Sequence, residues 1–204
     1  MIAGCCYGAS ESSTLVREIA IHEAGHAVIA WAMGVKVLKL EIAGGEPLVD
    51  FQGVSYPNVA GWVINSMGVN TNSCFWPPQN DADRMAYRYY KARIEQELPI
   101  LFAGVAAESV YSRKSVDELL TQGGKHDSKC IAEYLDVLKQ MGMDETEVLA
   151  TCNAAQDKAV ELVNQYQWEI TGIALILARW EVLWGDEFYH YMTLFTKQGC
   201  MEAC

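Results

Sequence analysis

The sequence has little positive charge. It carries 15 Lys and Arg residues against 26 Asp and Glu residues, which gives a formal net charge of -11. Nucleic acids and anionic membrane surfaces attract basic proteins, so this balance argues against both as general partners. We therefore predict that the protein has no nucleic-acid partner.

Long apolar runs are also missing. The longest, Ala27–Met33 and Ile170–Ala178, reach at most about half of the roughly 20 residues that a membrane helix needs. The first six residues contain neither a basic region nor an apolar stretch, so we expect no secretion signal there. Together these features predict a protein without a membrane span.

The seven cysteines follow no regular framework, because their number is odd and no C-x-x-C pair occurs. Disulfide-rich secreted domains show even numbers of regularly spaced cysteines. We therefore expect a reduced, cytoplasmic compartment. A chain of 204 residues buries roughly 70% of its unfolded surface, so it needs neither disulfides nor a metal merely to fold.

The apolar pattern is mainly helical. Hydrophobic residues make up 51% of the chain and charged residues 20%, which is typical of a globular domain. Apolar residues at three- and four-residue steps, with Gly and Pro as boundaries, predict helices at 14–33, 81–98, 99–112, 126–141, 145–165, 168–184 and 186–196. Short apolar runs predict three strands at 35–42, 48–56 and 59–64. The fold class is thus α+β, predominantly helical, with a small antiparallel sheet near residues 35–64.

The domain boundaries follow from composition. Residues 1–13 are small and polar and predict a flexible N-terminal segment. A single domain follows over 14–196, and residues 197–204 are expected to be a C-terminal tail. Residues 66–80 concentrate Gly, Asn and two prolines, which predicts a long surface loop.

The strongest functional signal is the H-E-x-x-H motif at His22-Glu23-Ala24-Gly25-His26, inside the amphipathic helix predicted at 14–33. Residues four apart share a helix face, so both imidazoles can bind one ion. Glu23 lies one step round the helix, where its carboxylate can contact a water bound to that ion and act as general base. The pattern predicts a zinc hydrolase with His22 and His26 as ligands and Glu23 as the catalytic residue.

Two histidines do not complete a catalytic zinc site, which usually has three protein ligands and a water. The remaining candidates are His126, Asp127, Glu108, Asp157 and His190. No further histidine follows His26 at the spacing of the metzincins, so that subclass is not supported. The residues by themselves leave the third ligand open.

Three segments in order resemble the peptidase domain of the FtsH family, which are AAA+ zinc proteases usually anchored in membranes. His22-Glu-Ala-Gly-His-Ala-Val-Ile-Ala30 is similar to the family's zinc-binding helix, and Leu101-Phe-Ala-Gly-Val-Ala-Ala-Glu108 to a helix that usually reads L-x-G-G-R-A-A-E-E. Gly123-Gly-Lys-His-Asp127, followed by Met141-Gly-Met143, is similar to the family's G-A-x-N-D segment and closing G-M. The resemblance covers about residues 14–185.

This resemblance implies a zincin-like metallopeptidase fold and a third zinc ligand at Asp127. It implies that Glu108 holds the site in place from behind the ligands and does not bind the ion. It further implies a zinc endopeptidase that hydrolyses peptide bonds of unfolded proteins or peptides, with Glu23 activating the metal-bound water. Because family peptidase domains form rings, a homo-oligomer is a further expectation.

Two departures from the family open an alternative function. The chain contains no AAA+ ATPase module, and Val105 stands where the family has arginine. We therefore expect ATP-independent cleavage by the chain alone, or cleavage with an ATPase partner in trans. The alternative is a non-catalytic zinc-binding regulatory module that docks on a separate ATPase or protease. The intact Glu23 favours the enzyme, and an extended substrate is expected to add to a sheet edge near residues 48–64.

Overall fold

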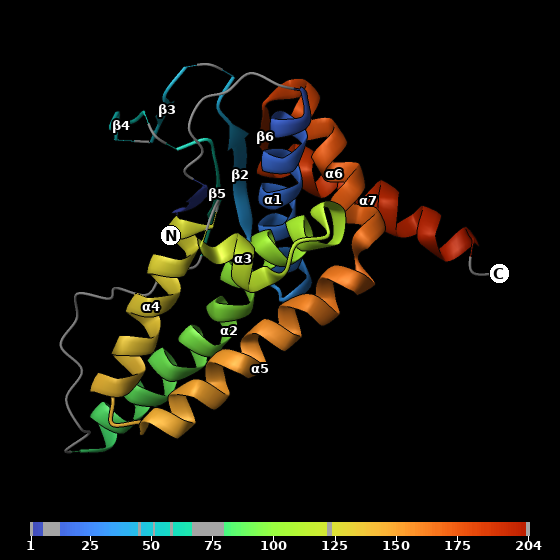
Figure 1. Ribbon diagram of the computed structural model, residues 1–204. Helices are drawn as coiled ribbons and strands as arrows, with labels where there is room; N and C mark the ends of the chain where they lie inside the picture. Colours follow the sequence, from blue (N-terminus) through green and yellow to red (C-terminus); the bar gives the residue numbers. More distant parts are fainter. Residues whose placement is uncertain are drawn as a thin grey trace.

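The structure is a computed structural model, and it describes residues 2–5, 13–44, 46–50, 52–57, 59–66, 80–121 and 124–202. These residues are mostly helical, and a small antiparallel sheet accompanies the helices, so the predicted α+β class is confirmed (Figure 1). The helices are α1 (Ser13–Ala32), α2 (Asp81–Ser112), α3 (Val116–Thr121), α4 (Lys125–Gln140), α5 (Glu145–Gln165), α6 (Gln167–Trp180) and α7 (Gly185–Glu202).

The sheet combines strands from both ends of the chain. Its order is β1-β5-β2-β6, and every neighbouring pair is antiparallel. The strands are β1 (Ile2–Cys5), β2 (Val37–Ile42), β5 (Gly61–Asn65) and β6 (Val182–Trp184). Two further short strands, β3 (Leu48–Val49) and β4 (Ser55–Tyr56), pair with each other.

The predicted strands at 35–42 and 59–64 do pair, with Ile42 opposite Gly61. The strand predicted at 48–56 is wrong as a member of this sheet, because a turn divides it into β3 and β4. Asp50 Oδ1 accepts hydrogen bonds from the backbone N–H groups of Gln52 and Val54, both at 2.9 Å. An Asp side chain that binds its own backbone in this way favours a turn over a continuous strand.

The outer strands were not predicted. Ile2–Cys5 lies within the segment expected to be flexible, yet it pairs with β5, whose edge offers unpaired backbone groups. Glu181, with φ of 62°, ends α6 in the left-handed region. Val182–Trp184 then pairs with β2, although the sequence predicts a helix to residue 184. Pairing with an available strand edge decides both cases.

Two helix boundaries also differ from the prediction. α2 is one helix through Pro99, although the sequence predicts a new helix there. Proline removes one helical hydrogen bond, but its neighbours Leu98 and Ile100 are buried in the core and hold the chain in place. α7 continues to Glu202 and so includes most of the predicted tail at 197–204. Of the predicted loop at 66–80, residues 67–79 lie outside the described residues.

α1 lies in the centre of the molecule, beside β2 and in contact with α2 and α6 (Figure 1). Every residue from Ile19 to Ala30 is buried, so this part of the helix is surrounded on all sides. The prediction of an amphipathic helix at 14–33 is therefore wrong. A Cβ added at Gly25 would lie 2.6 Å from the carbonyl oxygen of Ala103 and 2.7 Å from Ala107 Cβ. Small residues thus let α1 and α2 cross in close contact.

Helix length and hydropathy also bear on membranes. Within the described part of the chain, no helix combines the length and apolar character needed to cross a bilayer.

Candidate metal centre

Three side chains from α1 and α4 meet at one point in the core. His22 Nε2 lies 2.9 Å from Asp127 Oδ2 and 3.0 Å from His26 Nε2. The third side of this triangle, from His26 Nε2 to Asp127 Oδ2, measures 3.5 Å. All three residues are fully buried. Folding therefore brings together two helices whose contributing residues are up to 105 positions apart.

The triangle has the dimensions of a metal site. Nitrogen and oxygen ligands about 2.0–2.1 Å from a tetrahedral ion lie roughly 3.3 Å from each other. The observed separations of 2.9, 3.0 and 3.5 Å lie on both sides of that value. Two imidazoles and a carboxylate suit zinc and several other first-row metals. The group of His22, His26 and Asp127 could therefore bind a metal ion.

Hydrogen bonds on the far side of each ring set the tautomers. His26 Nδ1 lies 2.7 Å from the carbonyl oxygen of Ile100, which only accepts, so Nδ1 carries the hydrogen. His22 Nδ1 lies 3.3 Å from Glu108 Oε2, and an ionised carboxylate likewise only accepts. In the neutral rings both Nε2 atoms then direct a lone pair toward Asp127. Three acceptors this close together need a cation between them, either a proton or a metal ion.

Asp127 is held in its ionised form. Burial raises the pKa of this carboxyl. His26 and His22 together lower it by more than burial raises it, so the net pKa lies well below its usual range. Its position in the first turn of α4 also favours a negative charge. Among the described residues its second oxygen, Oδ1, is buried without a hydrogen-bond partner. A cation at the triangle would offset the cost of burying that oxygen.

Glycines keep the space around the triangle open. A Cβ added at Gly104 of α2 would lie 2.4 Å from His26 Nε2 and 2.5 Å from His22 Nε2, where no larger residue fits. A Cβ at Gly124 would lie 2.5 Å from Val105 Cγ1, so the start of α4 rests closely on α2. Gly104 was not among the site residues predicted from the sequence. The signal in the sequence is a glycine inside a helix. Such a glycine costs about 1 kcal/mol relative to alanine, so its presence indicates a place where a larger side chain does not fit.

The two glutamates predicted near the site lie on different sides of it. Glu23 is fully buried and packs against Gly61 of β5, where an added Cβ would lie 2.7 Å from Glu23 Oε1. Glu23 is not part of the three-residue group, and its role as general base stays a prediction. Glu108 is also buried and contacts His22 on the ring nitrogen that faces away from Asp127.

The other candidate ligands lie elsewhere. Asp157 on α5 and His190 on α7 are exposed and do not join the group. His126 is next to Asp127, but its Nε2 lies 3.6 Å from Cys130 Sγ. Burial, with a contribution from Asp127, raises the pKa of the Cys130 thiol to about 11, so this sulfur is a poor metal ligand at neutral pH.

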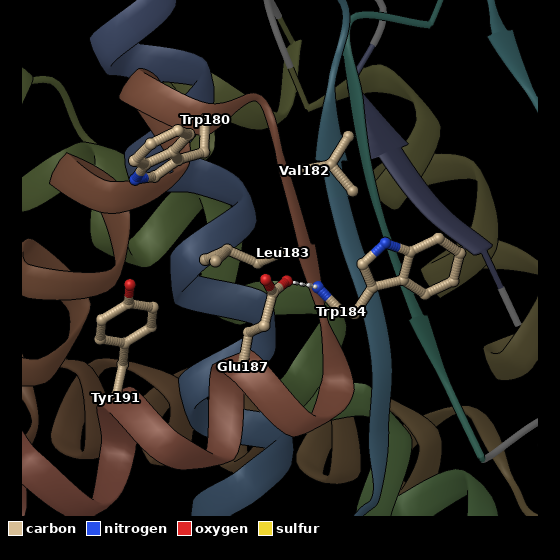
Figure 2. Close-up of a pocket in the computed structure, with 6 residues that line it drawn as sticks. All are labelled: Trp180, Val182, Leu183, Trp184, Glu187 and Tyr191. Carbon is tan, nitrogen blue, oxygen red and sulfur yellow. Dashed lines mark hydrogen bonds between the residues drawn. The ribbon is translucent and has the colours of Figure 1, made fainter.

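A cavity of about 350 Å³ lies at the β6 edge of the sheet, between α6 and α7 (Figure 2). Glu187 accepts a hydrogen bond from the backbone N–H of Trp184 there, at 2.9 Å. The cavity is lined by Trp180, Val182, Leu183, Trp184, Glu187 and Tyr191. None of these belongs to the metal-ligand group, so the cavity and the candidate metal centre are separate features.

Comparison with known proteins adds nothing to this geometry. No family model matches the chain, and no curated protein matches it. The resemblance to the FtsH peptidase domain therefore stays a prediction, and the function must be argued from the site.

Proposed function

We propose that the protein is a zinc-dependent endopeptidase related to the FtsH peptidase domain. His22, His26 and Asp127 hold the ion, and Glu23 is the general base. The observation that carries this proposal is the buried triangle of two imidazoles and one carboxylate, with a further buried carboxylate adjacent in sequence to a ligand. A purely structural metal site has no use for that fourth group.

A bound zinc ion supplies a Lewis acid, which lowers the pKa of a water and polarises a carbonyl. The chain supplies orientation and proton transfer. Ile100 and Glu108 hold the two rings with their Nε2 atoms toward the ion. Glu23 accepts the proton of the attacking water on its carboxylate and delivers it to the nitrogen of the leaving amine. Its place one residue after His22 keeps this carboxylate near the ion without making it a ligand.

The proposed substrates are unfolded proteins or peptides. Both histidines, Asp127 and Glu23 are fully buried, so the surface of a folded protein cannot reach them, which favours extended, unfolded chains as substrates. We propose cleavage by the chain alone, with an ATPase partner in trans as the source of unfolded chains where folded proteins are the substrates.

The same complete burial favours one alternative. A catalytic zinc site must admit water and substrate to an open coordination position, whereas a structural site needs no such access. A non-catalytic zinc module that docks on a separate ATPase or protease is therefore the second candidate. The two candidates differ in whether Glu23 matters once zinc is bound.

The deciding experiment compares zinc-loaded wild type, Glu23→Gln and Glu97→Gln in the cleavage of casein. Glu97 is the matched control, because it is another buried glutamate but lies outside the ligand group. We expect one zinc per chain in all three proteins, equal cleavage by wild type and Glu97→Gln, and at least about a 100-fold loss in Glu23→Gln, as for a missing general base. Zinc binding without cleavage by any of them would support the regulatory module, and absence of zinc binding would reject both candidates.

A further inference from the structure

We propose that β1 occupies the edge of the sheet on which an extended substrate docks, so that this strand and the substrate compete for β5. The inference rests on the proposed function in one respect, namely that the competing peptide is the substrate. It assigns the docking edge and a self-inhibiting strand, neither of which follows from the metal site.

The pairing between β1 and β5 is regular. Cys5 lies opposite Gly61, Gly4 opposite Trp62 and Ala3 opposite Val63, in antiparallel register. The other edge of β5 pairs with β2. Since both edges of β5 are taken, no peptide can pair with β5 until β1 leaves.

The β1 edge is the one beside the candidate metal centre. Gly61, the partner of Cys5, packs against the carboxylate of Glu23. β1 also contacts α4, the helix that carries Asp127, and Figure 1 shows it between β5 and the start of that helix. The opposite edge, β6, borders the cavity of Figure 2 instead. A peptide in the place of β1 would thus run past the general base.

Several properties make β1 exchangeable. It is four residues long, and as an edge strand it pairs on one side only. Gly4 weakens a strand, because glycine loses more backbone freedom on ordering than any other residue. Strand addition relies on main-chain hydrogen bonds, so peptides of many sequences can replace β1. Its covalent link to α1 gives β1 a high local concentration, which is why it holds the edge when no peptide is present.

The test uses proline in the full chain, because proline cannot donate a backbone hydrogen bond. Successive residues of an edge strand direct their N–H groups alternately toward and away from the neighbouring strand. One of Ala3→Pro and Gly4→Pro therefore removes a donor to β5, and the other removes an outward N–H and serves as the matched control. Both are placed in zinc-loaded Glu23→Gln protein, so that the probe is not cut.

The probe is a fluorescein-labelled peptide with the sequence of residues 1–6, both cysteines replaced by serine, and its binding is followed by fluorescence anisotropy. We expect one proline variant to bind the probe at least about tenfold more tightly than the control variant and the parent, because the tethered competitor is gone. Equal binding by all three proteins would overturn the inference. Loss of zinc binding or of cooperative unfolding in the variant that lacks the hydrogen-bond donor to β5 would also overturn it, since β1 would then be a fixed part of the fold.

Casein cleavage by the same proline variants, with Glu23 restored, separates the two proposals. Tighter probe binding together with faster cleavage supports both. Tighter probe binding without any cleavage keeps the docking edge and rejects the peptidase. Cleavage at one rate by all proteins, with unchanged probe binding, keeps the peptidase and rejects the docking edge.

Discussion

Asp127 and Glu97 are both buried carboxylates, yet their surroundings have opposite effects on them. Burial raises the pKa of Glu97, and the hydrogen bond from the Tyr134 hydroxyl to its Oε2 offsets only part of that rise. Two imidazoles lower the pKa of Asp127 well below its usual range despite complete burial. Each carboxylate has one oxygen without a hydrogen-bond partner among the described residues.

The difference lies in the partners. A neutral phenol stabilises a buried carboxylate weakly, so Glu97 favours its protonated form more than an exposed glutamate does. The imidazoles can carry positive charge beside Asp127, or their lone pairs can share a cation with it, and either arrangement stabilises an ionised carboxylate. A buried acid alone is thus no sign of a metal centre, whereas an acid kept ionised by groups that can themselves bind a metal marks a candidate site.

Replacement of the carboxylate by an amide should lower zinc affinity at Asp127 and leave it unchanged at Glu97. Asp127→Asn replaces the charged candidate ligand by a neutral amide, and we expect zinc affinity to fall by well over the 10- to 100-fold typical of losing a residue behind a ligand. Glu97→Gln should keep wild-type affinity. Competition with a chromophoric chelator measures both, and equal zinc affinity in Asp127→Asn and wild type would remove Asp127 from the site.

A smaller effect is expected from Gly104→Ala. In an open helix interior this change stabilises by up to about 1 kcal/mol. Here the new methyl group would lie 2.4–2.5 Å from both Nε2 atoms, so we expect at least about a tenfold loss of zinc affinity. Gly172→Ala is the control, because the three atoms nearest to its Cβ would all belong to the ring of Phe195, with Cζ at 2.6 Å, and not to a candidate ligand. Unchanged zinc affinity in Gly104→Ala would show that the space beside the histidines is not needed.

The smallest effect concerns Glu97 and pH. Its folded pKa is raised, so the native state holds a proton that the unfolded state has lost, and this contribution to stability disappears as pH rises toward the folded pKa. Between the unfolded and the folded pKa of Glu97, one proton changes the free energy of unfolding by about 1.4 kcal/mol per pH unit. We expect Glu97→Gln to gain stability relative to wild type as pH rises from 5 to 8. Urea unfolding across this range measures it, and a constant difference would contradict the assignment.

The local part of the site was predictable, and the long-range part was not. The four-residue spacing of His22 and His26 places both rings on one helix face whatever the tertiary fold. The third residue of the group, Asp127, comes from a helix that begins about a hundred residues later, and the residues alone left five candidates for the third ligand. Only the resemblance singled out Asp127, and only the structure shows that Gly104 clears the space between α2 and the rings.

The fold shows the same division. Helical spacing predicted α1, α4 and α5 to within a residue or so, because apolar periodicity is a local property. β1 and β6 were missed because strand addition depends on a free neighbouring edge and not on propensity. Pro99 signals a helix start in the sequence, but core packing around it keeps α2 continuous.

The distance along the chain between the candidate ligands has a consequence for folding. His22 and Asp127 are separated by 105 residues, so an ion held by both would close a very large loop. A covalent cross-link around a loop of about 100 residues limits the unfolded chain enough to stabilise a protein by about 4.7 kcal/mol in the chain-entropy model. A coordinated ion acts as such a cross-link for as long as its ligands stay bound. The centre that is proposed to cleave other chains would then also act as a cross-link that stabilises the fold of this one.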